Sequence, residues 1–545
     1  MAEGMVEGRR VWAMRAAALI AGTAAAFAQP PWGFLPGLLG YGLMLWLVDR
    51  SASPRPLRSA FVLGWLTGVG YFVVSVWWIA EPFQIDAKEQ GWMAPFAVIF
   101  VSMFMALFWG GAALAYRALA GGGVARVLLF AATLSLFEWL RGHILTGFPW
   151  DLPGETWGAG SAPSQVAALF GVYGLTWITL AAFCAPAVIR EGWRGRGAVI
   201  LAALTVIALF GFGAARLAGA PAARSAGPWV RVVQADVKQE NKYDQRLFAD
   251  IVGRYTGLTA RPSARVPDIV VWPEGAIPAA LNDYLAPGAW THDAIAGVLS
   301  PGQTLLLGGY RYGDDRAGAP VIYNSLAVVR KVGTDLAVTG VYDKFRLVPF
   351  GEFMPLDTLA ARLGIKQLVH VGDGFAPGPP PRPMRLDGLP PVQPLICYEA
   401  LYSGFTRAGA RASGLRAAWI VNISNDAWFG TASGPVQHLN MASYRAIEEG
   451  LPMVRATPTG ISAFIDAFGR IVPGERLGEG AFGVIDAPLP PALGPTLFDR
   501  WGDGAFWAML IVSLVGANFA WVSALRIKWP NHSPPIGGGE GGGGF

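Results

Sequence analysis

The chain has 545 residues, of which 53% are hydrophobic and 14% are charged, against about 25% charged residues in ordinary soluble domains. This composition excludes a chain built only of soluble domains, because apolar runs fill the region before about residue 217 and return near residue 504. The net charge of +5 does not indicate nucleic-acid binding, because the arginines gather in short loops between apolar segments. The two cysteines, Cys184 and Cys397, cannot form a disulfide framework, and Cys184 is interpreted as a buried packing residue.

Eight apolar segments have about the length that a bilayer span requires. They cover 11–28, 32–49, 59–80, 93–116, 124–141, 164–188, 197–215 and 504–525. The first is expected to be a retained helix and not a signal peptide, because further spans follow it. We therefore expect a membrane domain of seven transmembrane helices over 1–217, an eighth transmembrane helix over 504–525, and a flexible Gly-rich tail over 530–545.

Lysine and arginine are distributed unequally between the two sides of this predicted bundle. One side holds Arg9, Arg10, Arg15, Arg50, Arg55, Arg58, Arg117, Arg126, Arg190, Arg194, Arg196, Arg526 and Lys528, and the other holds Lys88 and Arg141. Because short cytoplasmic loops are enriched in basic residues, the first side is predicted to be cytoplasmic, together with both termini. Seven spans then place 216–503 outside the cytoplasm, where thiols tend to oxidise. An unpaired Cys397 in that compartment needs a functional reason.

The region over 228–495 has the pattern of a soluble domain, with apolar β-type runs that alternate with helix-like segments. Strands are predicted at 230–237, 268–272, 304–309, 324–329, 394–398, 417–424 and 462–467, and helices at 244–260, 290–299, 400–412 and 435–450. Continuous apolar strands favour an α/β sandwich with its helices outside. Residues 373–391 are expected to be a Pro-rich loop. The sequence GEGAFG at 478–483 is expected to be a turn and not a dinucleotide fingerprint, because no βαβ unit follows it.

Three reactive side chains stand at or near the ends of predicted strands, where the ligand sites of α/β folds collect. Glu274 follows DIVVWP, Lys344 lies in YDKFRLVPFGEFMP, and Cys397 ends PLIC. Taken singly, each is compatible with an ordinary role as a turn charge, a surface charge or a packing thiol. Together they supply a base, an oxyanion stabiliser and a nucleophile for acyl transfer through a thioester. The five scattered histidines give a metal site little support, and no cofactor is expected.

The motifs around these residues resemble one known superfamily. VVWPEGAIP, YDKFRLVPFGEFMP, LICYEALY and NISNDAWFG resemble the Glu, Lys, Cys and post-Cys motifs of the nitrilase (carbon–nitrogen hydrolase) superfamily. Within it, the multi-span N-terminus, EWLRGHILTGFPW (138–150) and the stretch over 424–457 resemble the apolipoprotein N-acyltransferases. The resemblance covers nearly the whole chain apart from the tail. It implies a polytopic α-helical membrane domain plus an αββα nitrilase-like domain, which stands on the outer, periplasmic face of a bacterial inner membrane.

The resemblance also implies an activity and its partners. A fatty acyl chain would pass from a membrane phospholipid to the N-terminal amine of a diacylglyceryl-cysteine lipoprotein. Cys397 would be the nucleophile, Glu274 the general base and Lys344 the oxyanion stabiliser. The same resemblance implies that Glu352, Tyr398 and Glu399 support the site, and its candidates for substrate binding are Lys242, Tyr243, Asn324 and Trp428.

The chain departs from the family in two places. Tyr243 stands where the family commonly has Trp, which keeps an aromatic surface but loses the indole. RATPTG (455–460) replaces a common Arg-Ala-Thr-Asn-Asn-Gly, so the polar contacts of that loop are in question. The aromatic segment GFPWDLPGETW (147–157), between the fifth and sixth predicted spans, is interpreted as a lid or as an aromatic belt at the membrane interface.

Three alternatives remain open. A membrane-held amidase of the nitrilase type would use the same three residues, with water as the acceptor. A Cys–His protease would pair Cys397 with His438. A transporter or receptor would use polar residues inside its spans, for which Glu138 and Arg141 are candidates.

Overall fold

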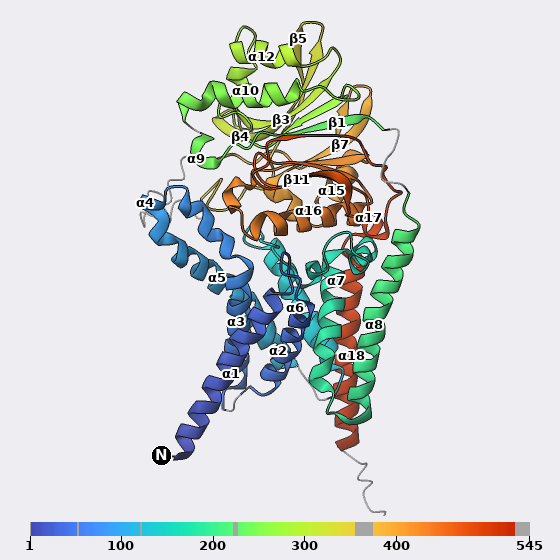
Figure 1. Ribbon diagram of the computed structural model, residues 1–545. Helices are drawn as coiled ribbons and strands as arrows, with labels where there is room; N and C mark the ends of the chain where they lie inside the picture. Colours follow the sequence, from blue (N-terminus) through green and yellow to red (C-terminus); the bar gives the residue numbers. More distant parts are fainter. Residues whose placement is uncertain are drawn as a thin grey trace, which may run out of the picture.

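The computed structural model describes residues 2–51, 54–119, 123–221, 227–242, 244–354 and 374–528, with side chains between residues 8 and 516. Figure 1 shows a bundle of helices below and a sandwich of two sheets above it. The sandwich follows the bundle in the chain, and the chain then returns to the bundle as its last helix. Two predicted features, Tyr243 and the tail over 530–545, lie outside the described residues.

A helix forms at each of the eight apolar segments. These helices are α1 (Ala2–Ala26), α2 (Leu39–Asp49), α3 (Pro56–Ser75), α5 (Ala94–Leu119), α6 (Arg126–His143), α7 (Ala167–Cys184), α8 (Gly192–Ala218) and α18 (Gly504–Lys528). Within the described residues, four segments are long and apolar enough to cross a membrane: Pro56–Ser75, Ala87–Leu119, Pro163–Val188 and Gly192–Ala218. Leu35–Asp49 and Gly504–Gly516 are shorter apolar helices. The count of eight spans therefore stays a prediction, although the helices themselves are confirmed.

Short helical segments join the long ones. They are η1 (Leu35–Leu38), η2 (Trp77–Gln84), α4 (Ala87–Gln90), η3 (Gly91–Met93), η4 (Pro153–Thr156), η5 (Pro163–Val166) and η6 (Ala185–Val188). At the end of the bundle away from the sandwich, Arg126 pairs with Asp49 at 2.9 Å and with Glu191, which ties three interhelical connections together. The N-terminus and the C-terminal end of α18 lie at this same end (Figure 1).

The sandwich consists of two six-stranded sheets. Its strands are β1 (Trp229–Gln234), β2 (Ile269–Trp272), β3 (Thr304–Asp314), β4 (Pro320–Val332), β5 (Asp335–Asp343), β6 (Met384–Leu386), β7 (Leu389–Ile396), β8 (Trp419–Ile423), β9 (Met453–Ala456), β10 (Ser462–Ile465), β11 (Ile471–Leu477) and β12 (Gly483–Pro488). The first sheet has the order β12-β1-β2-β3-β4-β5 and the second β11-β10-β9-β8-β7-β6. In each sheet three central strands run parallel, β1-β2-β3 in one and β7-β8-β9 in the other.

Helices cover both outer faces, so the αββα architecture is confirmed. The sandwich contains α9 (Gln239–Lys242), η7 (Gln245–Leu247), α10 (Phe248–Thr259), α11 (Leu281–Tyr284), α12 (Trp290–Val298), η8 (Cys397–Leu401), α15 (Phe405–Ser413), η9 (Asp426–Phe429), α16 (Gly434–Glu449) and α17 (Leu497–Trp501). One apolar core lies between the sheets and a second joins α10 to α12 with the first sheet. A third runs without interruption from the second sheet through α16 into the membrane helices. The sandwich and the bundle therefore share one core.

Most predicted elements of the sandwich are confirmed, with two corrections. Residues 373–391 are not simply a loop, because β6 and the start of β7 lie within them. The helix predicted at 400–412 begins only at Phe405, since the chain first makes the 3₁₀ turn η8. The sequence at 478–483 is a connection and not a nucleotide fingerprint, and it carries the chain from β11 in one sheet to β12 in the other.

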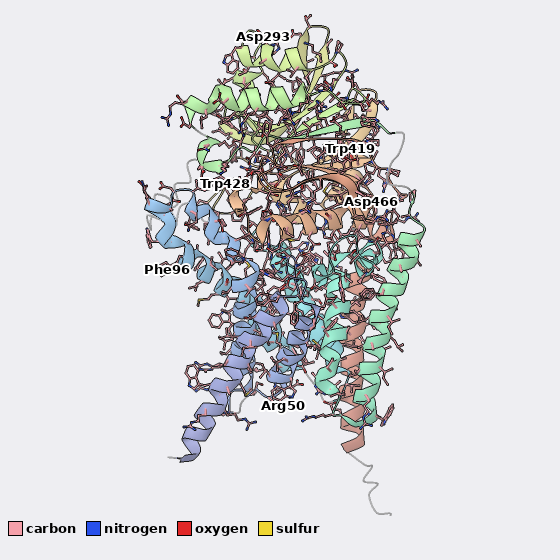
Figure 2. The ribbon with its side chains drawn as sticks, viewed as in Figure 1. Arg50, Phe96, Asp293, Trp419, Trp428 and Asp466 are labelled. Atoms are coloured by element: carbon pink, nitrogen blue, oxygen red, sulfur yellow. The ribbon has the colours of Figure 1, made fainter. Side chains whose placement is uncertain are left out.

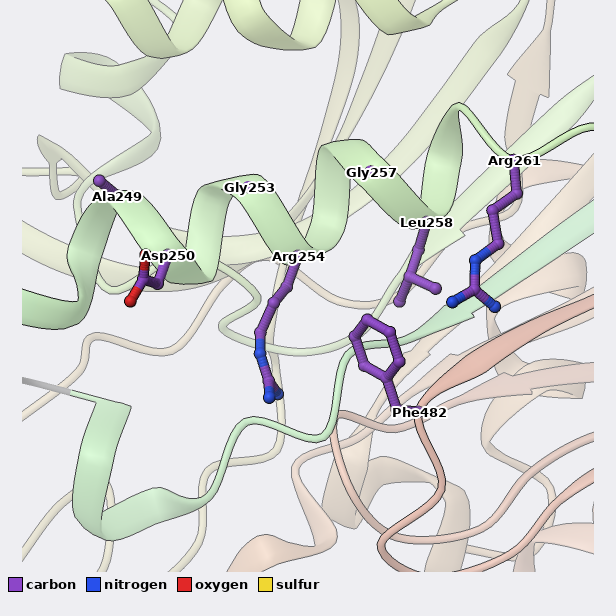
Figure 3. A pocket seen from close by; sticks show the side chains of 8 residues that line it. All are labelled: Ala249, Asp250, Gly253, Arg254, Gly257, Leu258, Arg261 and Phe482. Carbon is purple, nitrogen blue, oxygen red and sulfur yellow. The ribbon is translucent and has the colours of Figure 1, made fainter.

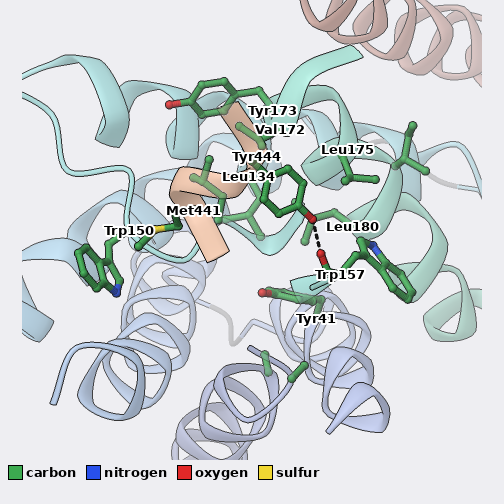
Figure 4. Close-up of a cluster of buried hydrophobic side chains, with 14 of the residues drawn as sticks. Tyr41, Leu134, Trp150, Trp157, Val172, Tyr173, Leu175, Leu180, Met441 and Tyr444 are labelled. Atoms are coloured by element: carbon green, nitrogen blue, oxygen red, sulfur yellow. Dashed lines mark hydrogen bonds between the residues drawn. The ribbon is translucent and has the colours of Figure 1, made fainter. Parts of the chain in front are cut away.

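The interpretation of residues 147–157 as a lid or membrane belt is wrong. Trp150, Asp151 and Glu155 are at most 1% exposed. The hydroxyl of Tyr444 on α16 donates a hydrogen bond to the carbonyl of Trp157 (Figure 4). This aromatic segment is a buried joint between the bundle and α16, because the sandwich covers the side that would otherwise face outward.

Candidate active site

The three reactive residues meet where strands of the two sheets end. Glu274 follows β2 in the first sheet, and Cys397 follows β7 in the second. The backbone of Cys397 has φ +50°, a left-handed conformation that is unfavourable for a residue with a side chain. The following residues at once form the turn η8. Such a strained turn directly after a central strand places the thiol between the sheets, where it is 7% exposed.

The carboxylate of Glu274 is held on both oxygens. Its Oε1 accepts hydrogen bonds from Asn324 Nδ2 at 2.7 Å and from Lys344 Nζ at 3.3 Å. Its Oε2 accepts a hydrogen bond from the backbone N–H of Asn425 at 2.7 Å. Burial raises the pKa of Glu274, but the charges of Lys344 and Lys242 and the bond from Asn324 outweigh it, so the pKa lies below its ordinary value. Glu274 is therefore an ionised carboxylate with a fixed orientation at neutral pH.

Lys344 bridges two carboxylates. Its Nζ lies 2.9 Å from Glu352 Oε1 and 3.3 Å from Glu274 Oε1. Asn324 Nδ2 also joins both, since it donates to Glu352 Oε1 at 2.7 Å. The backbone N–H of Val348 donates to the other oxygen of Glu352 at 2.8 Å. Burial would lower the pKa of Lys344, but both carboxylates raise it above its ordinary value, so the ammonium stays charged.

Cys397 is a thiol and not a thiolate in this environment. Burial and the charge of Glu274 raise its pKa to about 12, although Lys344 and a hydrogen bond with Ser424 act in the opposite direction. Glu274 and Lys344 therefore both lie close enough to act electrostatically on the sulfur. The structure thus brings the three predicted residues together around one buried thiol.

Glu399, two residues after the cysteine, binds the segment that carries Lys344. Its Oε1 accepts hydrogen bonds from Tyr342 Oη and the N–H of Phe345, both at 2.8 Å, and from the N–H of Arg346 at 3.2 Å. Its Oε2 accepts from the N–H of Ile396 at 2.8 Å. Burial raises the pKa of Glu399 to about 7. The carboxylate fixes the end of β7 against the end of β5 and is completely buried.

Tyr398 and Tyr402 bind a loop of the helical bundle. The hydroxyl of Tyr398 donates to the carbonyl of Gly147 at 2.5 Å. The hydroxyl of Tyr402 lies 3.0 Å from the same carbonyl and 3.1 Å from that of Thr146. The residue next to Cys397 is thus anchored to the connection between α6 and α7.

His438 uses both ring nitrogens away from the sulfur. Its Nε2 faces the carbonyl oxygen of Cys397 at 3.3 Å, and its Nδ1 lies 3.0 Å from Asp426 and 3.1 Å from Arg455. Burial and the neighbouring Arg455 lower the pKa of His438, so the ring is neutral. A carbonyl and a carboxylate both only accept, so the single proton of the neutral ring serves either the carbonyl of Cys397 through Nε2 or Asp426 through Nδ1. His438 therefore supports the cysteine backbone, and this arrangement disfavours the Cys–His alternative.

The candidate substrate-binding residues Lys242 and Trp428 differ in their burial and in their position relative to Glu274. Lys242 is buried, and a Cβ on Gly275 would lie 2.5 Å from its Nζ, so the ammonium stands beside Glu274. Burial lowers the pKa of Lys242 to about 8, and Glu274 acts against that shift. Trp428, on η9, is 41% exposed at the edge of the sandwich (Figure 2).

The loop over 455–460, which departs from the family pattern at Pro458 and Thr459, makes polar contacts through Arg455 and Thr459. Arg455 Nη2 donates to both oxygens of Asp426, at 2.9 and 2.7 Å. Thr459 Oγ1 donates to Asp236 at 2.9 Å. Three features of the site were not predicted from the sequence: the bridge by Asn324, the backbone N–H of Asn425, and the group of Asp426, His438 and Arg455. Asn425 and Asp426 lie within the SNDAWFG motif, so the motif could have indicated that they belong to the site.

A separate surface cavity of about 530 Å³ lies on α10 and shares no residue with this site. In Figure 3, Arg254 and Arg261 lie near the ring of Phe482, at 5.1 and 5.3 Å from its centroid. Gly253 and Gly257 form its floor. The candidate active site, a buried cluster of charges around a thiol, lies apart from this cavity.

Comparison with known proteins agrees with this arrangement. Residues 21–185 match the family described as apolipoprotein N-acyltransferase N-terminal domain, and residues 230–494 match carbon–nitrogen hydrolase. The chain is 56% identical over 506 residues to the apolipoprotein N-acyltransferase of Caulobacter vibrioides, which covers 92% of this chain and 94% of that one. It is 39% identical over 511 residues to that of Bradyrhizobium diazoefficiens, covering 90% and 92%. It is 37% identical over 521 residues to that of Brucella melitensis, covering 92% and 94%.

The sandwich, its strand-end site and the attached apolar helices define a membrane-bound enzyme of the carbon–nitrogen hydrolase class. The two matches together, and relatives aligned over nine-tenths of their length, identify it further. The chain belongs to the apolipoprotein N-acyltransferase family.

Proposed function

We propose that this protein transfers a fatty acyl chain from a membrane phospholipid to the N-terminal amine of a diacylated lipoprotein, through a thioester on Cys397. The observation that carries the proposal is the ionised Glu274, held by Lys344 and Asn324, beside the buried thiol of Cys397. The names of the relatives point to the same reaction. The acyl donor stays in the bilayer because each buried CH₂ contributes about 0.8 kcal/mol, so the enzyme must work at the membrane.

In the first half-reaction, the sulfur of Cys397 bonds to the ester carbonyl carbon while Glu274 takes the thiol proton. Lys344, kept charged by its two carboxylate partners, stabilises the oxyanion. The C–O bond then breaks, Glu274 returns the proton to the departing alkoxide, and a lysophospholipid leaves. The fatty acyl group remains as a thioester on Cys397.

In the second half-reaction, the neutral α-amine of the lipoprotein bonds to the thioester carbon and Glu274 takes one of its protons. The C–S bond breaks, the amide is released, and the sulfur of Cys397 recovers the proton from Glu274. The first product, the lysophospholipid, must leave before the lipoprotein amine reacts, so the kinetics are ping-pong. Glu352, Tyr398 and Glu399 hold the three reacting groups in place and take no proton in this scheme.

Lys242, Asn324, Tyr243 and Trp428 are proposed to shape the substrate site. Asn324 holds Glu274 and Glu352 together, and Lys242 adds a second positive charge beside the base. Trp428 is the exposed member of η9, which packs through Phe429 on Trp78 of η2, with ring centroids 4.6 Å apart. This position between the sandwich and the bundle suits contact with a substrate that arrives from the bilayer.

We also propose that the chain crosses a bacterial inner membrane eight times, with both termini in the cytoplasm and residues 228–495 in the periplasm. The unequal distribution of Lys and Arg supports this orientation. An apolar helix bundle whose two chain ends lie away from the sandwich is compatible with it (Figure 1).

Mass spectrometry of the purified protein after incubation with a phospholipid tests the first half-reaction. We expect one fatty acyl mass on the peptide that contains Cys397, and its transfer to a diacylated lipopeptide in a second incubation. Cys397→Ala should form no adduct, and Glu274→Gln should form it about 10²- to 10⁴-fold more slowly. Release of free fatty acid in place of acylated peptide would favour the amidase alternative. Acylation of the peptide by Cys397→Ala would refute the thioester.

A further inference from the structure

Arg141 stands at the end of α6 nearest the sandwich and is only 1% exposed. It forms an ion pair with Glu138, one turn earlier on the same helix. Trp109 Nε1 on α5 donates to Glu138 at 2.5 Å, and the guanidinium lies 5.1 Å from the ring centroid of Phe72 on α3. Burying a charged side chain among three helices is costly unless its charge and its hydrogen-bond donors are fully paired. The presence of Arg141 here therefore needs an explanation.

The rest of the guanidinium binds the connection between α6 and α7. Nη1 of Arg141 donates to the carbonyls of Phe148 at 2.5 Å and Trp150 at 3.0 Å. Between these bonds and the helix, the chain passes through left-handed conformations at Leu145 (φ +53°), Thr146 (φ +75°) and Gly147 (φ +81°). Leucine and threonine adopt this conformation only where their surroundings impose it. Arg141 supplies that constraint from the helix side.

One carbonyl of the strained loop over residues 145–147 contacts the candidate active site. The carbonyl of Gly147 accepts hydrogen bonds from Tyr398 at 2.5 Å and Tyr402 at 3.0 Å. Tyr398 directly follows Cys397, whose own backbone is left-handed. The strained loop of the bundle and the strained turn at Cys397 are thus joined through the hydrogen bond between the Gly147 carbonyl and the Tyr398 hydroxyl.

We propose that Arg141 is a positioning residue for Cys397, which acts through the carbonyl of Gly147 and the hydroxyl of Tyr398. By holding Phe148 and Trp150, the guanidinium fixes where the Gly147 carbonyl lies, and the tyrosine fixes the turn that presents the sulfur. A displacement of about 1 Å at a reacting atom costs on the order of 10²-fold in rate, so the effect belongs to the rate of acylation and not to lipid affinity. The proposal rests on the proposed thioester function.

Arg141→Lys tests this assignment, because lysine keeps a positive charge for Glu138 but not the planar group that reaches two carbonyls. We expect the rate of acyl-adduct formation on Cys397 at saturating phospholipid to fall by about 10- to 100-fold, with KM nearly unchanged. Arg126→Lys is the matched control, because Arg126 lies on the same helix and pairs with Asp49 at the far end. Its acylation rate should equal that of the wild type.

A double-mutant cycle separates positioning from general stabilisation. Tyr398→Phe removes only the hydroxyl, and in that background Arg141→Lys should cost less than about threefold, because the route to Cys397 is already broken. Additive losses, or equal rates for Arg141→Lys and Arg126→Lys, would overturn the proposal. If Arg141→Lys does not fold, Trp109→Phe replaces it in the cycle with the same expected loss of additivity. Absence of an adduct in the wild type would instead refute the thioester function itself.

Discussion

At the level of single residues, the site combines an acid that stays protonated with a base that stays ionised. Burial and Glu274 keep the Cys397 thiol protonated, with a pKa of about 12. The neighbours of Glu274 hold its pKa below the ordinary range in spite of burial. In the proposed reaction the proton therefore moves only as the new S–C bond forms. A thiol kept neutral in this way also resists oxidation, since the thiolate is the form that reacts.

The second lysine gives this balance a measurable pH dependence. Lys242 lowers the pKa of Glu274, so Lys242→Met should raise that pKa and shift the acid limb of the acylation profile upward by about one pH unit. The sign follows because a protonated Glu274 is no base, and it becomes protonated at a higher pH without the nearby charge. The measurement is the rate of adduct formation on Cys397 between about pH 4 and 8.

Two further variants control that experiment. Lys242→Arg keeps the charge and should keep the wild-type acid limb. Lys238→Met removes a charge from an exposed lysine four residues earlier and should leave the limb in place. An identical shift in Lys238→Met and Lys242→Met would mean that the shift comes from net charge and not from contact with Glu274.

At the level of elements, α16 supports the cysteine turn from behind. Nε2 of His438 lies 3.3 Å from the carbonyl of Cys397, and Asp426 and Arg455 hold Nδ1 on the other side of the ring. His438→Gln can place an amide N–H near the position of Nε2, so it should keep the acylation rate within about fivefold. His438→Ala leaves the carbonyl unpaired and should cost about tenfold, which corresponds to one hydrogen bond of about 1.4 kcal/mol.

The same pair of variants decides between two roles of the histidine. If His438 were the base of a Cys–His pair, both variants would lose as much activity as Cys397→Ala. The acyl adduct on Cys397, followed at pH 7 by mass spectrometry, measures the difference. A loss in His438→Gln that matches Cys397→Ala would revive the protease alternative.

Most of the strands that the sequence did not predict lack a continuous apolar run. Strand β9 is fully buried but has only four residues, one of them Arg455, and it was also missed. Strands β2 and β8 are buried over their whole length and read as continuous apolar runs, so they were predicted. Strands β5 and β11 lie largely on exposed edges and were missed, because their mixed sequences carry no such run. Around the site, Glu274, Lys344 and Cys397 could be identified from their motifs. The bridging bonds of Asn324 and the backbone N–H of Asn425 could not, because these contacts join residues 28 to 151 positions apart in the sequence.

At the level of the whole molecule, the shared core is the feature that the sequence concealed. The apolar contacts of α16 continue into α7 and the aromatic joint over 147–157. There Trp150 Nε1 donates to Gln437 on α16. A catalytic domain tethered by flexible linkers would not need such contacts. The shared core fixes the distance between the Cys397 thiol and the helix bundle. A fixed distance suits the proposed phospholipid substrate, whose reactive ester lies at the surface of a bilayer.

The orientation of this assembly in the membrane is the last prediction. Arg50 and Asp293 lie at opposite ends of the molecule (Figure 2), and the side chain of Asp293 is 73% exposed. Both native cysteines are buried, so an introduced cysteine provides the signal in labelling with a membrane-impermeant maleimide. Asp293→Cys should react in intact spheroplasts, and Arg50→Cys only after the membrane is permeabilised. The expected side follows from the basic loops, which stay in the cytoplasm because translocation of clustered Lys and Arg is disfavoured.

The reverse labelling pattern would mean that the whole protein is inverted, with the sandwich in the cytoplasm. If neither variant reacts before the membrane is permeabilised, an odd number of the predicted spans between residues 50 and 293 is wrong. Removal of Arg50 alone should not invert the protein, because twelve of the thirteen basic residues on that side remain. Reaction of both variants in intact spheroplasts would indicate leaky membranes, which cytoplasmic and periplasmic marker proteins labelled in the same sample detect. Cys397 serves as an internal reference, since a thiol buried between two sheets should stay unlabelled until the protein is unfolded.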